Sequence, residues 1–419
     1  MFKKYFGDMG FWRIALKLAF PVAMQNLLTS SFILVDTIMV GQLGDLSLSA
    51  VGMAGQFGWF LNMITFGMCS GAAVFISQYW GAKDTAGIRR TYGIAVVSVC
   101  LISALFFVIG LLFPEGVVRI FNREPDVVEA GAAYLRIACW SYLATGVNMV
   151  FCIVLRSTEN VKLPMYVSLV TTVLNAFMDY GLIFGAFGMP EMGIRGAALA
   201  TVIARWLEMF YLVGRTYRNR AKFKFVQGAF RSFRIPLSLV KKIAVTGTPL
   251  LLNETLWSIG MATINMCYAT RGLTAVAATN INATVWNLFS IVMAAMGNAI
   301  GILSGQLLGA NEIEKAKDTV RKLLVFSVAA NLVMGGLIMA SAPFIPHIYN
   351  TEEVVRHTAT RLLLISGAFL PLSAYVQGTY FTIRSGGKTF ITFLFDCVFT
   401  WVVCLPIAYL LCNFTGLSV

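Results

Sequence analysis

One short motif occurs twice in this sequence. Residues 78–84 read QYWGAKD, and residues 306–312, which lie 228 positions further on, read QLLGANE. The same offset pairs other residues on both sides of the motif: Pro21 with Pro249, Gly44 with Gly272, Thr91 with Thr319, Ile120-Phe121-Asn122 with Ile348-Tyr349-Asn350, and Arg156-Ser157 with Arg384-Ser385. A single offset that holds over so long a stretch predicts two homologous halves in one chain.

The composition predicts an all-α polytopic membrane protein. Of the 419 residues, 58% are hydrophobic and 12% are charged, whereas soluble domains average about 25% charged residues. This excludes a disordered chain, a secreted disulfide scaffold, an ordinary cytosolic enzyme and a nucleic-acid binder. The spans should be helices, because lipid offers backbone groups no other hydrogen-bond partner.

Apolar runs between charged or Gly/Pro clusters predict eleven spans. They lie at about residues 14–40, 48–80, 91–113, 130–155, 163–187, 193–217, 240–269, 274–307, 320–342, 358–383 and 388–411. Six spans per half would return the chain to the same side, so the two halves are expected to be parallel copies, as in many transporters.

The offset also predicts the domain organisation. An N-lobe of six spans should cover residues 1–219, a cytoplasmic linker residues 220–236, and a C-lobe of five spans residues 237–419. Val419 corresponds to Glu191, which precedes the sixth span of the first half. A twelfth span is therefore expected at about 420–447, outside this chain.

The positive charges predict the orientation. The formal net charge is +13, and 24 Lys and Arg residues fall on one side of the predicted spans against seven on the other. Because cytoplasmic loops collect Lys and Arg, the N-terminus is expected in the cytoplasm. The basic cluster Arg215–Lys242 would be the central cytoplasmic loop. Its charge is more simply explained as a topology determinant than as a lipid-headgroup site.

Several classes of chemistry have no signature in the sequence. The eight cysteines lie in or beside apolar runs and form no CxxC, which is typical of packed, reduced thiols. There is no GxxxxGK[ST] loop and no nucleophile–base arrangement. We therefore expect neither an enzyme nor a cofactor, and the cysteines indicate neither a metal site nor a disulfide framework.

Ionisable residues inside spans are costly, so each is a candidate for function. The acids without an adjacent base are Asp36, Asp179, Glu254 and Asp396, and no base in the spans is unpaired. Arg205 and Glu208 are three residues apart and are expected to form a structural ion pair.

Four oxygen-bearing side chains are expected at one depth. Asp36, Asp179 and Thr201 each lie five to eight residues from the outer end of a span, which places them roughly 7–12 Å below it. Asn175 precedes Asp179 by four residues and shares its helix face. This set could coordinate Na⁺ or share a proton, and the alternative is a polar network that joins helices.

A second set follows the two paired prolines. Gln25 and Asn26 come after Pro21, and their counterparts Asn253 and Glu254 come after Pro249. We expect these four side chains to face a central cavity, where Glu254 would attract a cationic substrate, take a proton or serve as a structural hydrogen-bond partner. Asp396 falls near mid-membrane, with no opposite charge within one turn. The sequence leaves open whether its side chain lines the cavity.

Several stretches resemble the multidrug and toxic compound extrusion (MATE) transporters. They are VDTIMVGQLG after the first span, the QYWGAKD and QLLGANE loops, LNAFMDYGLIFG, GIRGAALATVI and IRSGGKT. The resemblance implies a twelve-helix, two-lobe fold and an N-lobe cation site at Asp36, Asn175, Asp179 and Thr201. In one branch of the family a span-seven glutamate acts with a span-ten acid. Glu254 matches the span-seven glutamate, but the predicted tenth span of this chain contains no acid.

The resemblance also implies a function. The chain is expected to export drug-like amphiphilic, often cationic, compounds in exchange for H⁺ or Na⁺. It should do so as a monomer in contact with membrane lipid, in a plasma membrane, most simply a bacterial inner membrane. The alternatives left open are a lipid-linked oligosaccharide flippase of related architecture and a receptor or channel that does not transport.

The orientation can be tested at Gly228, inside the basic cluster. The variant Gly228→Cys should resist an impermeant thiol reagent in intact cells and react after permeabilisation, because the loop is expected in the cytoplasm. The wild-type chain, with its cysteines in apolar runs, gives the background labelling. Rapid labelling of Gly228→Cys in intact cells would reverse the proposed topology.

Overall fold

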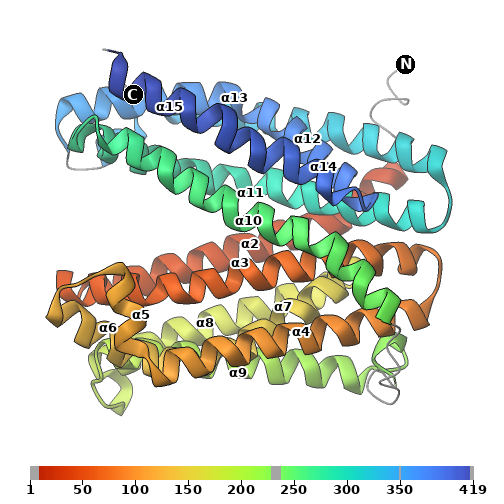
Figure 1. Ribbon diagram of the computed structural model, residues 1–419, viewed down its shortest axis with the longest axis horizontal. Helices are drawn as coiled ribbons and strands as arrows, with labels where there is room; N and C mark the ends of the chain where they lie inside the picture. The colour runs from red at the N-terminus through yellow and green to blue at the C-terminus, as the bar shows by residue number, and fades with distance from the viewer. Residues whose placement is uncertain (1–8, 228–236, 349–350, 416–419) are drawn as a thin grey trace. The chain divides into compact units, whose positions relative to one another are not determined.

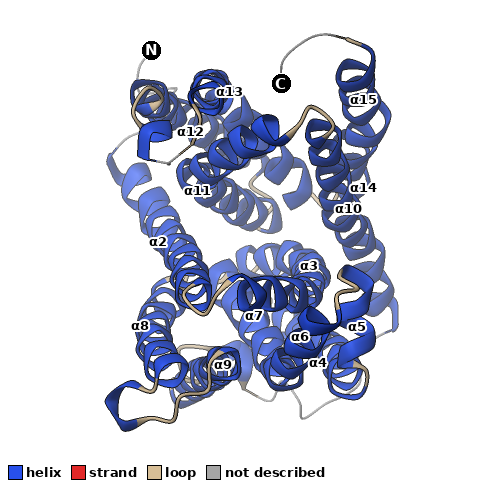
Figure 2. Cartoon of the chain, turned by 90° about the vertical axis from the view of Figure 1, so that its left-hand side faces the viewer, coloured by secondary structure: helices blue, strands red, loops and turns tan. Residues whose placement is uncertain are grey.

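Helices make up all the regular structure of residues 9–227, 237–348 and 351–415, the parts of the chain that the computed structural model describes (Figure 2). Gly228 lies outside these ranges. Among the described residues, ten helical segments are long and apolar enough to cross a membrane. An eleventh long helix, α10 (Leu237–Ala269), is not among the ten but covers the predicted seventh span.

The helices follow the predicted spans along the chain (Figure 1). In the first half they are α2 (Met9–Gly41), α3 (Asp45–Gly81), α4 (Thr85–Leu112), α5 (Pro114–Phe121), α6 (Pro125–Ala138), α7 (Tyr142–Ser157), α8 (Lys162–Phe184) and α9 (Ile194–Arg218). After α10 come α11 (Leu273–Gly309), α12 (Ile313–Ser341), α13 (Glu353–Ser385), α14 (Thr389–Phe393) and α15 (Leu405–Phe414).

The sequence repeat is also a structural repeat. The bounds of α10 and α11 lie 228 residues after those of α2 and α3, and α13 begins and ends 228 residues after the α6–α7 segment. The turns repeat as well, since Lys83 and Asn311 both adopt left-handed backbone, with φ of 58° and 60°. The predicted pair of homologous halves is confirmed.

The chain forms two compact units. One contains Met24–Leu251, and the other contains Met1–Ala23 together with Leu252–Val419. The chain therefore changes unit inside α2 and inside α10, in each case between the internal proline and the amide residue four positions later. The lobe boundaries predicted at residues 219 and 237 divide the chain differently and stay a prediction.

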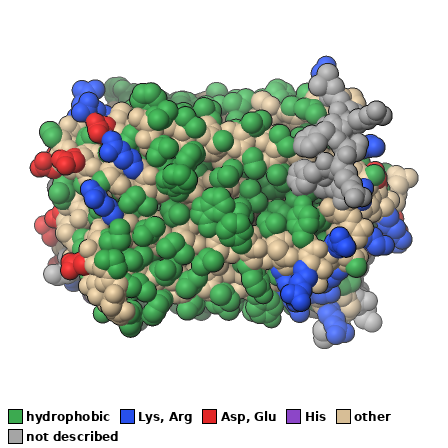
Figure 3. All heavy atoms as spheres, turned by 90° about the horizontal axis from the view of Figure 1, so that it is seen from below, with side chains coloured by type: hydrophobic (Ala, Val, Ile, Leu, Met, Phe, Trp, Pro, Cys, Tyr) green, Lys and Arg blue, Asp and Glu red, His purple; other side chains and the backbone are tan. Residues whose placement is uncertain are grey.

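Each unit has its own core, and much apolar surface lies outside it. In the unit of Met24–Leu251, Tyr92 is buried against the rings of Phe151 and Phe225. In the other unit, Ile338 and Leu363 are fully buried in one cluster. Hydrophobic side chains cover the middle of the face in Figure 3, and charged side chains lie at its two ends. Apolar side chains on the outside are expected where the solvent is lipid.

Small residues allow some helices to pack very closely. In α12, Gly335 lies against α13, and a Cβ at Gly335 would lie 2.3 Å from the carbonyl oxygen of Gly367. Without a hydrophobic force between helices in lipid, such close backbone approach is a main source of helix association. The next residue, Gly336, has no atom within 4 Å of the same hypothetical Cβ.

These adjacent glycines give a matched stability test. Gly335→Ala should destabilise the protein by about 1–3 kcal/mol, because the methyl group overpacks a fixed backbone carbonyl. Gly336→Ala should be neutral or stabilising by up to about 1 kcal/mol, because alanine is the better helix former. Thermal unfolding in detergent measures both. Equal effects at the two positions would mean that this contact does not limit the packing of α12 on α13.

Candidate functional site

Asp179 is a carboxylic acid in the interior of the unit Met24–Leu251. It lies on α8, its exposed fraction is 0%, and neither carboxyl oxygen has a hydrogen-bond partner among the described residues. Asn175 lies one turn earlier on the same buried face, and its amide nitrogen also has no partner there. Burying such groups without partners costs free energy, so their retention favours a role in binding.

Asp36 is the second acid of this site. It lies half-buried on α2, and its Oδ1 atom is buried without a partner among the described residues. Asp36 and Asp179 are within electrostatic range of each other. The structure therefore brings together two of the predicted residues. A third, Asn175, lies on the face of Asp179, and the fourth, Thr201, lies half-buried on α9.

Tyr134 belongs to the same neighbourhood and was not predicted. It is buried on α6 and lies within electrostatic range of both carboxyl groups. The depth argument could have identified it, because Tyr134 lies four residues inside the outer end of the predicted fourth span, or about 6 Å below it. Its hydroxyl is a hydrogen-bond donor of the kind that a buried carboxylate lacks here.

The site is chemically suited to one small cation. Carboxylate, amide and hydroxyl oxygens are hard ligands that accept Na⁺, and a proton would neutralise one of two buried acids. Within the described ranges, no group of three or more His, Cys, Asp or Glu side chains could hold a metal ion. The described site thus has two acids, Asp36 and Asp179, with the polar side chains of Asn175 and Tyr134 near them.

A polar network lies in the same unit. Gln25 is buried on α2, donates to the Ser168 hydroxyl at 3.0 Å, and accepts from Arg156 at 2.6 Å. The Ser168 hydroxyl in turn donates to Glu208 at 3.5 Å. Glu208 pairs with Arg205 at 2.9 Å, as predicted. These contacts join α2 to α7, α8 and α9 immediately after the position where α2 enters this unit.

Three further predicted residues come together in the other unit. Asn253, buried on α10, donates to the Asp396 carboxylate at 2.8 Å and to the Tyr380 hydroxyl at 3.3 Å. The adjacent Glu254 lies 3.7 Å from a guanidinium nitrogen of Arg384. Asp396 sits in a π-helical turn, Leu394–Val398, between α14 and α15, and such turns often occur at functional sites.

Arg384 corrects one expectation. The sequence placed it in a loop after the tenth span and found no unpaired base in the spans, but Arg384 lies inside α13 with only 4% of its side chain exposed. Asp396 accepts a hydrogen bond from the neutral amide of Asn253. The predicted substrate role of Gln25, Asn26, Asn253, Glu254 and Asp396 stays a prediction, and Asn26 is half-buried.

Two halves of this chain match one family model. The model described as MatE matches residues 21–181 and again residues 249–410, the same two halves that the repeat defines. The chain belongs to the MatE family. A second model, Lipid II flippase MurJ, matches residues 124–268 only.

Curated relatives of this MATE-family chain cover nearly its whole length. It is 26% identical to the probable multidrug resistance protein YoeA of Bacillus subtilis, over 97% of this chain and 88% of the relative. It is also 26% identical to the probable multidrug resistance protein NorM of Thermotoga maritima, over 96% of this chain and 86% of the relative.

Solved structures show the same fold. A MATE protein in complex with MaD3S matches with a TM-score of 0.89 at 20% identity, covering 99% of this chain and 91% of that one. A MOP superfamily transporter from Pyrococcus furiosus matches with a TM-score of 0.86 at 20% identity, covering 100% and 91%. These matches confirm the predicted fold class.

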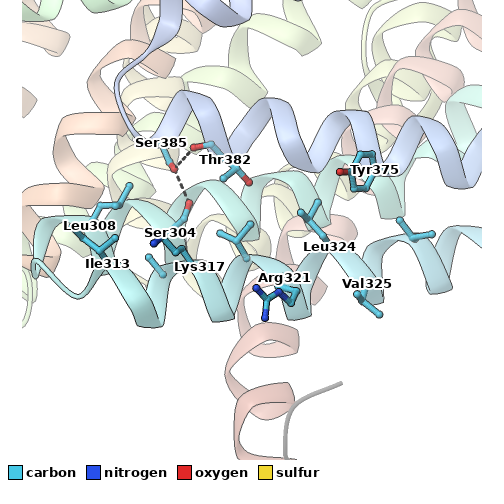
Figure 4. A pocket seen from close by; sticks show the side chains of 13 residues that line it. Ser304, Leu308, Ile313, Lys317, Arg321, Leu324, Val325, Tyr375, Thr382 and Ser385 are labelled. Carbon is cyan, nitrogen blue, oxygen red and sulfur yellow. Dashed lines mark hydrogen bonds between the residues drawn. The ribbon is translucent and has the colours of Figure 1, made fainter. Parts of the chain in front are cut away.

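Described residues of the unit Met1–Ala23 and Leu252–Val419 also line cavities. One, of about 720 Å³, lies between α10, α11, α13 and α15, and its lining includes Tyr268, Trp286 and Phe369 with Asn265 and Asn282. Another, of about 700 Å³, lies between α11, α12 and α13 (Figure 4). Its walls are mostly apolar, Lys317 and Arg321 project from α12, and the Ser304 hydroxyl donates to Ser385 at 2.7 Å.

Proposed function

We propose that this MATE-family chain is an antiporter that exports drug-like organic compounds, often cationic, in exchange for inward H⁺ or Na⁺. The observation that carries the proposal is the pair Asp36 and Asp179. Both carboxyl oxygens of Asp179 and Oδ1 of Asp36 are buried without hydrogen-bond partners among the described residues. A buried carboxylate of this kind is stable only when a proton, a cation or a donor neutralises it. The site therefore supports a mobile positive charge as its occupant.

The proposed mechanism couples this charge to conformation. When the cation leaves, two carboxylates remain in an apolar bundle, and their repulsion disfavours the packing that holds them together. A ligand shifts a conformational equilibrium by the ratio of its affinities for the two states. Since Asp36 lies on α2, which passes from one unit to the other at Ala23, loading and release would act directly on a helix that both units share.

The aromatic cavity is the proposed substrate site in the second unit. Its volume of about 720 Å³ lies within the range of about 300–1,000 Å³ that drug-sized ligands occupy. The faces of Trp286, Tyr268 and Phe369 would attract flat cations, and the amides of Asn265 and Asn282 would orient them. The relatives named for multidrug resistance support the same substrate class.

The proposed location is the plasma membrane, with the N-terminus in the cytoplasm. The excess of Lys and Arg on one side of the spans supports the orientation, and the bacterial relatives support a bacterial inner membrane. We propose a monomer, surrounded by lipid, as the working unit.

A lipid-linked oligosaccharide flippase is the second candidate. The specific observation in its favour is the match of residues 124–268 to the MurJ model. That match covers one continuous stretch, whereas the MatE model covers both halves. A pyrophosphate-linked substrate would require cavity cations, yet the aromatic cavity has one, Arg271, which donates to the backbone carbonyl of Leu411.

Drug uptake into everted membrane vesicles tests the proposal. Separately imposed Na⁺ and H⁺ gradients should show which cation drives uptake in the wild type. Asp36→Asn should abolish gradient-driven uptake while the protein remains folded, because the amide is close to isosteric but cannot lose a proton. Glu254→Gln should reduce uptake less.

The matched control is Asp45→Asn, a change at an exposed acid in the first turn of α3, which should leave uptake unchanged. Normal gradient-driven uptake by Asp36→Asn would contradict the proposed coupling site. Glu254 or Asp396 would then be the leading candidate for the coupling residue. Flipping of a lipid-linked oligosaccharide without any drug uptake would favour the second candidate.

A further inference from the structure

The two buried polar clusters are copies of each other. In the first half of the chain the cluster consists of Gln25, Cys152, Arg156 and Ser168. The residues 228 positions later are Asn253, Tyr380, Arg384 and Asp396. In both clusters the amide nitrogen donates to the second and fourth members, at 3.7 and 3.0 Å from Gln25 and at 3.3 and 2.8 Å from Asn253. The repeat thus conserves a hydrogen-bonded frame around one arginine.

The two arginines use this frame differently. Arg156 donates to the amide oxygen of Gln25 from Nε at 3.2 Å and from Nη2 at 2.6 Å. Asn253 is one methylene shorter, and no described donor reaches its buried amide oxygen. Arg384 lies instead 3.7 Å from Glu254, at the position where the other half has Asn26.

Arg384 does not depend on Glu254 alone for its place. Its guanidinium lies over the rings of Tyr380 and Phe381, at 5.6 and 5.5 Å from their centroids. It also donates to the Tyr380 hydroxyl at 3.4 Å. These aromatic faces can hold the guanidinium when the carboxylate takes another partner.

Glu254 is open to such a partner. Its side chain is 21% exposed, against 4% for Arg384. The separation of 3.7 Å is longer than the roughly 2.7–2.9 Å of a charged N–H···O⁻ hydrogen bond, so the carboxylate keeps acceptor capacity. Asp396 lies within electrostatic range, and the named charges of the cluster are two acids and one base.

We propose that Arg384 is a tethered cation that competes with cationic substrates for Glu254 and thereby sets the charge selectivity of export. The inference rests on the proposed function, since it concerns substrates of that export. It adds Glu254 to the proposed substrate site, because Glu254 lies on α10 two turns before Met261, which lines the aromatic cavity. Arg384 acts through Glu254 and is a positioning residue. Removing its charge should strengthen the binding of cationic compounds and leave uncharged compounds of equal size unaffected.

Two probes of similar shape separate charge from packing. Tetraphenylphosphonium carries a permanent positive charge, and triphenylphosphine oxide is neutral. Binding of each radiolabelled probe to purified protein in detergent, and uptake of each into everted vesicles, would be compared for the wild type and for Arg384→Gln. We expect the apparent Kd for the cation to fall about five- to tenfold, a typical coupling between two sites, and the Kd for the neutral probe to change less than twofold.

Three further variants make the test specific. Arg384→Lys keeps the charge and should bind both probes as the wild type does. Glu254→Gln combined with Arg384→Gln should lose the gain in cation affinity. Arg156→Gln, the repeat-related control whose partner is a neutral amide, should affect both probes equally. Thermal unfolding reports whether each variant is folded.

The outcomes are distinct. Equal changes for both probes in Arg384→Gln, or a gain that survives in the double variant, would overturn the inference and leave Arg384 a structural residue. If the vesicles transport neither probe, the proposed function fails, and the binding measurements on purified protein still decide the role of Arg384.

Discussion

The burial of Asp179 is the constraint on which the site depends. A carboxyl group with an exposed fraction of 0% and no described hydrogen-bond partner raises the free energy of the folded state unless something neutralises it. Here the other described groups of the site with partner-free buried atoms are the Oδ1 atom of Asp36 and the amide nitrogen of Asn175, and neither residue is a base. The proposed mobile cation would neutralise this buried charge, and its loading and release would be the coupling step of the proposed antiport.

Duplication explains how one fold supplies two different polar centres. The frame around Gln25 and the frame around Asn253 share hydrogen bonds at the same sequence spacings. The counterparts of the neutral residues Ser168 and Asn26 are the acids Asp396 and Glu254, so the second cluster carries two acids at positions that are neutral in the first. Each frame holds hydrogen bonds to a helix, α2 or α10, two residues after that helix passes from one unit to the other. The divergence altered the charge without altering the scaffold.

The sequence predicted the features that follow from hydrophobic periodicity, from the internal repeat and from the free-energy cost of placing charges in a membrane. Span bounds were predictable from apolar runs, and the repeat from one constant sequence offset. The candidate acids were predictable because charged residues are rare inside spans. Arg384 was missed because it lies one residue beyond the predicted span 358–383, where burial depends on how far α13 extends. Tyr134 was missed because an aromatic residue in a span usually packs in the core, and only its proximity to the two acids distinguishes it. The π-helical turn at Asp396 has no sequence signature.

The most direct test counts the cations that the purified protein binds. Equilibrium dialysis with radioactive Na⁺ and potentiometric proton titration would be carried out on the wild type and on the variant that combines Asp36→Asn with Asp179→Asn. If the carboxyl pair holds a mobile cation, the wild type should take up about one more exchangeable cation per chain than the variant, shared by the pair as a unit. Equal uptake of Na⁺ and of protons by the two proteins would contradict the assignment of the cation site to Asp36 and Asp179.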